Sequence, residues 1–458
     1  MRVNLSSRSV ILQRPFTSNK TTMHVDTLLH PGWIITINAQ HPVLEGYSIA
    51  IQNGRICALC PQPQARREIT ADQIVDLPGQ VVMPGLINMH GHAPMNLFRG
   101  MADDLPLKTW LEEHIWPAEG RWLGPDFIRD GSALAIAEML RGGTTLYSDN
   151  YFFLEHSVPV IRQSGIRAQL CPTIIDFPTN WAKTAEEHLQ KSLNLAASCA
   201  GDEKILVTLG PHAPYSVSDK PLIAIRKAAE RHNLHIQMHV HETQHEVNES
   251  LKHYGKRPIA RLDALGLLDS NMQCVHVVAM NDQDIQTLAE RGASVVHCPE
   301  SNLKLASGFS PVQAMHNAGI RVTIGTDGAA SNNDLDMLGE MRTAAMLAKA
   351  VSNDAQAMNA EQTLRAATIN AAAVLGLDQE IGSVEIGKQA DLIAIDLDRI
   401  ECQPLFDPRS QVVYATSREQ VSHVWIQGEA VLTNRQLHTL DLEQIRTDAQ
   451  KWRSALAK

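Results

Sequence analysis

Short apolar runs alternate with helical stretches through the middle of the chain, from Met83 to Leu377. This alternation is typical of βα units around a parallel sheet. A doubly wound open sheet is less favoured, because no G-x-G-x-x-G follows the first strand. Eight units instead predict an α/β fold, a (β/α)8 TIM-like barrel over residues 83–379. We expect strands at 81–89, 144–148, 167–170, 205–209, 235–239, 273–277, 293–297 and 321–324, with helices at 127–141, 186–200, 220–231, 285–291 and 362–375.

Both ends of the chain differ from this middle region. Residues 23–82 and 380–458 contain short alternating segments separated by turn residues such as Asn53-Gly54. We therefore expect one small β-sandwich domain built from both chain ends, mostly from antiparallel strands, followed by a C-terminal helix. Its expected strands lie at 27–37, 47–59, 73–77, 386–396, 412–415 and 423–433.

Residues 1–22 contain Arg2, Arg8, Arg14 and Lys20 but no acidic residue. Such a composition is typical of a disordered tail or a transit peptide. We interpret it as a disordered extension or as a misassigned start, with the working start at Met23.

The overall composition excludes several classes of protein. The net charge of -10 and the pI near 6.0 give no sign of a surface for nucleic acid or membrane. No apolar run reaches the length of a membrane span. Seven scattered cysteines argue against a disulfide framework and for a reducing, cytoplasmic location. We interpret the Cys57 to Cys60 C-x-x-C as structural.

Metal-binding types of residue stand directly after several predicted strands. In a barrel the carboxyl ends of all strands meet at one face, so these residues are expected to share one site. His90 and His92 are separated by one residue, which places both side chains on the same side of a strand. The residues concerned are His90 and His92 after the first strand, His212 after the fourth, His239 and Glu242 after the fifth, His276 in the sixth and Asp327 after the eighth.

Three imidazoles and one carboxylate, from His90, His92, His239 and Asp327, suit Zn²⁺ or Fe²⁺ better than Mg²⁺ or Ca²⁺. The fourth strand offers no lysine to bridge a second ion, so we expect one divalent metal, with Zn²⁺ favoured and Fe²⁺ still open. Such an ion lowers the pKa of a bound water and supplies a hydroxide nucleophile.

Glu242 is not needed as a ligand, so it is free to carry protons; a salt bridge or a helix cap is the alternative. His241 is expected to support the site or to pack rather than to bind the metal. His276 is expected to polarise the attacking water, and a structural role is its alternative.

Longer segments around these residues carry a family resemblance from about Met23 to the C-terminus. Residues 84–92, 239–242, 299–305 and 325–328, together with His276, are similar to the mononuclear deaminase and chlorohydrolase branch of the amidohydrolase superfamily. Residues 97–100, 107–111, 115–119, 210–215 and 327–333 resemble those of 5'-methylthioadenosine/S-adenosylhomocysteine deaminases.

The resemblance implies hydrolytic deamination of an adenine nucleoside at C6, most specifically 5'-methylthioadenosine to 5'-methylthioinosine and ammonia. In that chemistry Glu242 protonates N1, Asp327 accepts the proton of the water and His276 orients it. Glu119 matches a ribose-binding carboxylate, His212 a further nucleoside contact and Trp110 a wall near the 5' substituent. From the residues alone, Trp110 and Trp116 indicate core or interface positions.

One departure from the family concerns the substrate. Members that hold the homocysteine carboxylate use arginines after the third strand, whereas residues 170–183 contain no arginine. Lys183 could take this role, but a solvated charge at the start of a helix explains it equally well. We therefore rank 5'-methylthioadenosine and adenosine above S-adenosylhomocysteine. A triazine chlorohydrolase or a guanine-type deaminase is the alternative enzyme, and a scaffold protein that has lost its ligands is the alternative class. Family analogy also predicts a homo-oligomer, a dimer or a tetramer.

Overall fold

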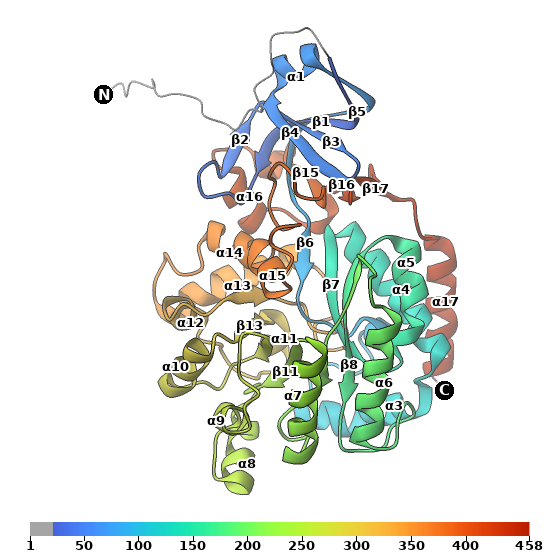
Figure 1. Cartoon of the computed structure of the whole chain (residues 1–458), viewed down its shortest axis with the longest axis vertical. Helices are drawn as coiled ribbons and strands as arrows, with labels where there is room; N and C mark the ends of the chain where they lie inside the picture. The colour runs from blue at the N-terminus through green and yellow to red at the C-terminus, as the bar shows by residue number, and fades with distance from the viewer. Residues whose placement is uncertain (1–21, 458) are drawn as a thin grey trace.

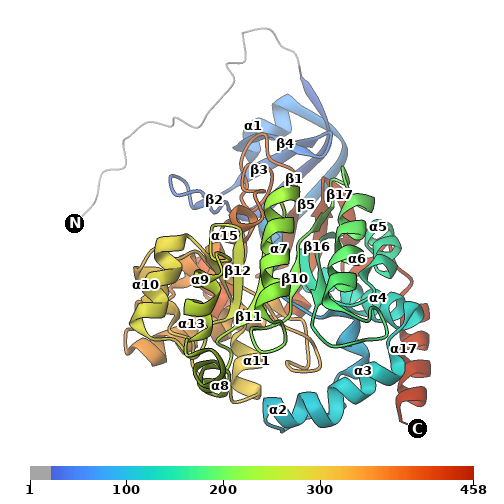
Figure 2. The same cartoon turned by 60° about the horizontal axis from the view of Figure 1, so that its bottom comes forward.

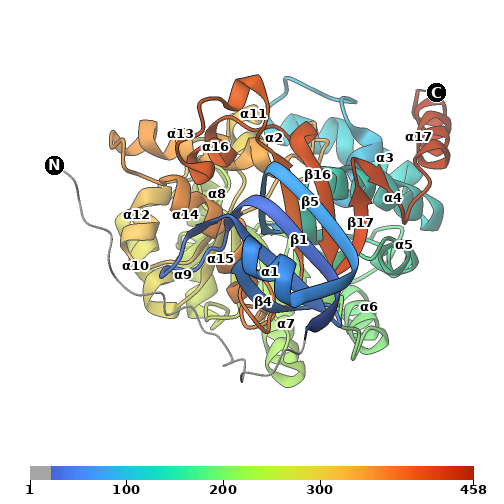
Figure 3. The same cartoon turned by 90° about the horizontal axis from the view of Figure 1, so that it is seen from above.

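The computed structural model describes residues 22–457, so the extension predicted at 1–22 lies almost entirely outside the described residues. Strands from both chain ends form one nine-stranded sheet in the order β18-β17-β16-β15-β5-β1-β3-β4, with β2 paired to β1 (Figures 1 and 3). The second layer that a sandwich requires stays a prediction. The strands are β1 (Met23–Ile35), β2 (Val43–Glu45), β3 (Tyr47–Gln52), β4 (Arg55–Pro61), β5 (Ile69–Pro84), β15 (Leu392–Asp396), β16 (Val421–Ile426), β17 (Glu429–Thr433) and β18 (Gln436–Leu437).

The middle of the chain forms parallel strands, as predicted for an α/β fold. One sheet contains β6 (Leu86–Asn88), β7 (Thr144–Tyr151), β8 (Arg167–Ile174), β9 (Ile205–Val207) and β10 (Gly210–Pro211). The other has the order β11 (Ile236–Val240), β12 (Met272–His276), β13 (Ser294–His297) and β14 (Val322–Ile324). Backbone hydrogen bonds join the two sheets at both edges, from Met89 to Ile324 and from Gln237 to Leu209, each 3.0 Å long.

Helices follow most of the parallel strands and cover their outer side (Figures 1 and 2). No helix among residues 22–457 is both long and apolar enough to cross a membrane. The helices are α1 (Gln62–Glu68), α2 (Leu107–Thr109), α3 (Trp116–Trp122), α4 (Pro125–Arg141), α5 (Val158–Ser164), α6 (Ala185–Ser198), α7 (Asp219–His232), α8 (Gln244–Tyr254), α9 (Pro258–Ala264), α10 (Asp282–Arg291), α11 (Pro299–Lys304), α12 (Val312–Asn317), α13 (Met337–Ser352), α14 (Ala360–Ala366), α15 (Ile369–Val374), α16 (Pro408–Tyr414) and α17 (Leu442–Leu456).

Some expected elements were wrong. Residues 412–415 were expected as a strand but lie at the end of α16. Two residues fix the start of this helix: the Asp407 carboxylate accepts a hydrogen bond from the Arg409 N–H at 2.9 Å, and Pro408 occupies the first turn. The helix expected at 362–375 is two helices, α14 and α15. The pairing of β1 with β5 is parallel rather than antiparallel.

The apolar run 81–89, expected as one strand, is divided between two sheets. β5 ends at Pro84 in the nine-stranded sheet formed by both chain ends, which we call the end sheet. β6 begins at Leu86 in the two sheets of parallel strands, which we call the parallel body. Gly85 lies between them, and a Cβ at this position would lie 2.2 Å from the Thr145 hydroxyl oxygen. Only glycine allows the chain to pass this close to its neighbour.

A buried ion pair connects the end sheet to the parallel body. Arg167 on β8 donates from Nε to the Asp391 carboxylate at 2.5 Å, and both side chains are at most 3% exposed. The same carboxylate accepts from the Gln427 backbone N–H at 2.8 Å.

We predict that Asp391→Ala lowers the free energy of unfolding by about 3–5 kcal/mol, because it leaves the Arg167 guanidinium buried without its partner. Urea denaturation measures this effect. Glu380→Gln is the matched control, because the Arg55–Glu380 pair is 46% and 41% exposed and should contribute less than about 1 kcal/mol. Equal losses in the two variants would contradict the prediction.

Candidate active site

The metal-type residues predicted from the sequence lie together at the carboxyl ends of the parallel strands. The His90 and His239 Nε2 atoms are 3.1 Å apart, and Asp327 Oδ1 lies 3.2 Å from His92 Nε2 and 3.6 Å from His90 Nε2. The ligand atoms form two overlapping groups, each within 4.8 Å, namely His90 with His239 and His276, and His90 with His92 and Asp327. The structure therefore brings all of the predicted ligands, and His276, into one cluster.

Each of these imidazoles is held through its Nδ1 atom. The carbonyl oxygens of Asn150 and His212 can only accept, so the rings they contact carry their proton on Nδ1. This leaves the Nε2 lone pair free for a metal ion. The four contacts are His90 to Gln237 Oε1 at 2.8 Å, His92 to the Asn150 carbonyl at 2.5 Å, His239 to the His212 carbonyl at 2.7 Å and His276 to Asn302 Oδ1 at 3.0 Å.

The Asp327 carboxylate is oriented by three donors. Ser301 and Ser331 donate to Oδ2 at 2.6 and 3.1 Å, and the Gly328 N–H donates to Oδ1 at 2.8 Å. Burial would lower the pKa of His92, but Asp327 outweighs it and raises this pKa to about 9. A divalent cation fits this position, because it would take the place of the proton that the carboxylate attracts to His92.

Sequence reasoning missed the residues that orient the ligands. Gln237 could have been found, because it lies two residues before His239 on the same strand and so shares its face. Ser301 and Asn302 lie in the segment that carried part of the family resemblance, but nothing in the sequence pairs them with Asp327 or His276.

The backbone is strained around this cluster. The φ angles of His241, His276 and Asp327 are 56°, 72° and 61°, and that of Val277 is 42°. Left-handed conformations are uncommon for residues other than glycine, and a β-branched side chain there is an outlier. Backbone hydrogen bonds enforce the conformation, including one from Asp327 to the His90 carbonyl at 3.0 Å. Strain that is held in this way is concentrated at functional sites.

Glu242 lies beside the cluster without contacting it directly. Its Oε1 atom is 3.9 Å from His276 Nε2, and the residue is 6% exposed. The Glu246 carboxylate fixes this turn by accepting from the backbone N–H groups of His241 and Glu242 at 2.8 and 2.9 Å. Burial, and then the nearby Asp327 carboxylate, raise the pKa of Glu242 to about 8. At neutral pH this carboxyl group therefore holds a proton that it can donate.

His241 does not point into the cluster. Its Nδ1 lies 3.1 Å from the Ala279 carbonyl, and its Nε2 accepts from the Ile259 N–H at 3.1 Å. Both ring nitrogens are therefore used within the fold, which agrees with the expected supporting role.

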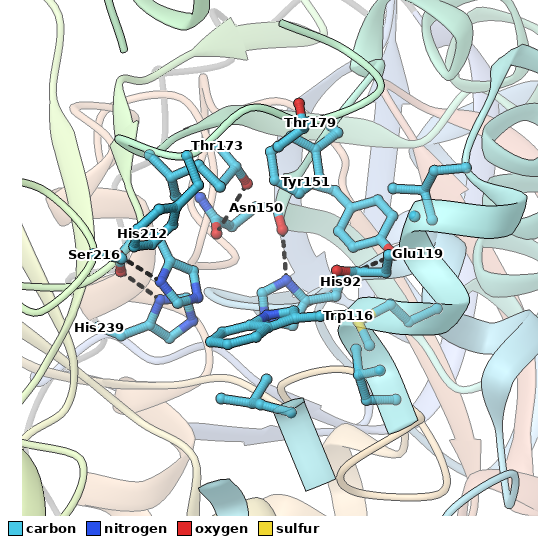
Figure 4. A pocket seen from close by; sticks show the side chains of 18 of the residues that line it. His92, Trp116, Glu119, Asn150, Tyr151, Thr173, Thr179, His212, Ser216 and His239 are labelled. Carbon is cyan, nitrogen blue, oxygen red and sulfur yellow. Dashed lines mark hydrogen bonds between the residues drawn. The ribbon is translucent and has the colours of Figure 1, made fainter. Parts of the chain in front are cut away.

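A cavity of about 530 Å³ opens from the cluster and contains the other predicted site residues, Glu119, His212 and Trp110. Tyr151 donates to Glu119 at 2.7 Å, and His212 Nδ1 lies 2.9 Å from Ser216 Oγ (Figure 4). Burial raises the pKa of Glu119 to about 7. Trp110 is 6% exposed and belongs both to the core and to the cavity wall, so its two expected roles are compatible.

The cavity wall away from the cluster is largely apolar. Lys183, its one cationic Lys or Arg side chain among the described lining residues, donates to the Thr179 carbonyl at 2.9 Å. A π-helical turn, Trp110–Ile115, forms part of the wall, and such turns occur frequently at functional sites. The apolar side chains include Leu107, Leu111, Ile115, Phe152, Phe153 and Phe177.

Several known proteins are similar to this chain. A sequence model of the amidohydrolase family matches residues 81–431. A 5-methylthioadenosine/S-adenosylhomocysteine deaminase of Teredinibacter turnerae is 45% identical over 96% of this chain and 99% of its own length. A 5'-deoxyadenosine deaminase of Methanopyrus kandleri is 42% identical over 88% of this chain and 93% of its own length. The crystal structure of an adenosine deaminase from Xanthomonas campestris with bound zinc superimposes with a TM-score of 0.93, at 47% identity, over 95% of this chain and 99% of that one.

The chain therefore belongs to the amidohydrolase family, in the group of the 5-methylthioadenosine/S-adenosylhomocysteine deaminases.

We predict that Asp327→Ala and His92→Ala each lose most of the bound metal, because each removes a side chain that we expect to be a ligand. His276→Ala should keep its metal, since we expect this residue to act on water rather than on the ion. Metal analysis of the purified variants measures both effects. Loss of metal in His276→Ala would instead place His276 in the ligand set, as its distance to His90 and His239 also allows.

Proposed function

We propose that the protein is a zinc-dependent deaminase that converts 5'-methylthioadenosine to 5'-methylthioinosine and ammonia, and that it also acts on adenosine. The observation that carries this proposal is the content of one cavity. It holds a metal-type cluster and the carboxyl groups of Glu242, whose pKa is raised, and Glu119, and the rest of its wall is largely apolar. The activities named for the relatives point the same way.

In this proposal His90, His92, His239 and Asp327 hold one divalent ion. Three imidazoles and a carboxylate suit Zn²⁺, and the Xanthomonas relative was crystallised with zinc; Fe²⁺ is the alternative. When bound, the ion supplies a water molecule that is activated at neutral pH. The surrounding parallel strands would form a closed (β/α)8 barrel, with β9 and β10 as the two parts of its fourth strand.

The protein side chains then move the protons. Glu242 donates its proton to N1 of the adenine ring, which makes C6 accept electrons from the attacking water. Asp327 accepts a proton from that water. The Nδ1 atom of His276 contacts Asn302, so His276 orients the water through its other ring nitrogen, Nε2. The C6–O bond forms, and Asp327 passes the proton it took from the water to the amino group, so the C6–N bond breaks and ammonia leaves. The proton that remains on the C6 hydroxyl returns to Glu242, so both carboxyl groups regain their starting states.

The shape of the cavity supports a ranking of substrates. Glu119, oriented by Tyr151, would accept hydrogen bonds from the ribose hydroxyls. The apolar wall suits a short thioether at the 5' position, whereas a homocysteine carboxylate would find only Lys183. A triazine or a guanine base carries no ribose, so it would leave Glu119 with the hydrogen bond from Tyr151 but without the hydroxyl partners that a ribose offers. This disfavours both alternative enzymes.

Two further proposals come from family analogy and composition alone. They are a homo-oligomer, either a dimer or a tetramer, and a cytoplasmic location. Light scattering at micromolar concentration tests the oligomer, and a monomer would contradict it.

The direct test of the function is the ultraviolet absorbance of metal-loaded protein mixed with 5'-methylthioadenosine, adenosine, S-adenosylhomocysteine or guanine. We predict loss of the aminopurine band and release of ammonia, with kcat/KM highest for the thioether nucleoside and lower for the homocysteine one. Guanine serves as the control base without ribose. If no adenine nucleoside reacts although metal is bound, the assigned activity is wrong.

Glu242→Gln tests the proton donor. The amide keeps the shape of the side chain but cannot donate a carboxylic proton, so kcat should fall by at least about 100-fold. The metal content should stay at the wild-type level, because Glu242 is not a ligand. A variant that loses its metal would show that Glu242 belongs to the ligand set.

A further inference from the structure

Three buried glutamine side chains lie in the interior between the parallel strands, next to His90. Gln169 on β8, Gln237 on β11 and Gln273 on β12 are each at most 1% exposed. The interior of such strand arrangements is usually filled by branched apolar residues. Burying an amide is unfavourable unless its polar atoms are hydrogen-bonded, so three amides in one layer require a specific reason.

The three amides form a connected chain that ends on His90. Gln237 Oε1 lies 2.8 Å from His90 Nδ1. The Gln237 amide nitrogen donates to the Met89 carbonyl at 3.0 Å and to Gln273 Oε1 at 2.8 Å. Gln169 donates to the same Gln273 oxygen at 3.2 Å and to Thr208 Oγ1 at 2.6 Å.

The direction of these hydrogen bonds is determined by one backbone group. The Met89 carbonyl can only accept, so the Gln237 nitrogen must face it and the Gln237 oxygen must face His90. An oxygen in that position requires a proton on His90 Nδ1. The lone pair of His90 is then on Nε2, the atom that faces His239 and Asp327. The opposite amide orientation would turn a donor toward Nδ1 and place the ring proton on Nε2.

We propose that Gln237 is a positioning residue that sets the tautomer of His90 for metal binding, and that Gln273 holds the Gln237 amide in the required orientation. The inference rests on the metal site proposed above and is independent of the substrate. His90 is the ligand that belongs to both overlapping groups of ligand atoms, so the whole cluster depends on its orientation.

The experiment compares zinc affinity in variants of the full-length protein, measured by competition with a chelator of known affinity. Gln237→Met keeps the approximate volume but removes the acceptor. We expect its zinc Kd to be about 10- to 100-fold weaker, the usual effect of removing a group that orients a ligand. Gln237→Glu keeps an oxygen toward His90 whether or not it is ionised, so it should restore most of the affinity.

Gln169→Met is the matched control, because Gln169 donates to the same Gln273 oxygen but does not contact His90. It should lower the thermal stability much as Gln237→Met does, while leaving the zinc Kd unchanged. Equal weakening of zinc binding in the two methionine variants, or wild-type affinity in Gln237→Met, would overturn the proposal.

A measurement without a variant covers the case in which Gln237→Met does not fold. In the zinc-loaded wild-type protein, ¹⁵N NMR of the histidine rings should show the His90 proton on Nδ1. Zinc on Nδ1 of His90 would overturn the proposal. If zinc affinities follow the expected pattern but no nucleoside reacts, only the proposed activity fails. If the wild type binds no zinc, the metal site and this inference fail together.

Discussion

The packing of several imidazoles out of contact with water is the constraint on which the rest of the site depends. Burial lowers the pKa of His90, His239 and His276, and for His239 the neighbouring imidazoles lower it further. These rings are therefore neutral at physiological pH, which is the state in which an imidazole binds a metal. Hydrogen bonds from Nδ1 then decide which nitrogen is available, so the fold controls both the charge and the tautomer of the ligands.

The same environment shifts the pKa values of two carboxyl groups in opposite directions. Burial acts to raise the pKa of both Glu242 and Asp327, but the adjacent histidine side chains outweigh it at Asp327 and hold that pKa well below its usual range. Glu242 has no cation as close and stays protonated near neutral pH. Two carboxyl groups with opposite protonation states are what an acid and a base in one reaction require.

Local periodicity predicted most of the parallel strands, and from their ends the sequence predicted that the four expected ligands lie close together. Histidines and an aspartate after successive apolar runs must meet wherever parallel strands end together. Strand alternation was nevertheless the wrong reason for His90 and His92, since β6 ends at Asn88 before either residue. They are placed instead by contacts distant in sequence, such as the hydrogen bond from the Asn150 N–H to the Gly91 carbonyl at 2.9 Å.

The failures have two physical causes: one local helix-start signal that was overlooked, and contacts between residues distant in sequence. Residues 412–415 are rich in β-branched and aromatic side chains, yet the Asp407 cap and Pro408 start a helix there. The contacts of Ser301 with Asp327 and of Asn302 with His276 could not be predicted, because the distance between α11 and the cluster is set by the complete fold. Only Gln237 left a local signal, through its spacing from His239.

The end sheet also contributes to the site, because one continuous segment of chain belongs to both. β5 lies in the end sheet and leads through Gly85 into β6, and one residue, Met89, separates β6 from His90. The Gly85 N–H donates to the Asp391 carbonyl at 2.9 Å, and the side chain of the same Asp391 forms the buried pair with Arg167. The segment that presents His90 is therefore anchored on a rigid sheet and not on a free loop. Sites on rigid elements hold their geometry more precisely. Because His90 lies only six positions after the end of β5, a shift of β5 would also move His90.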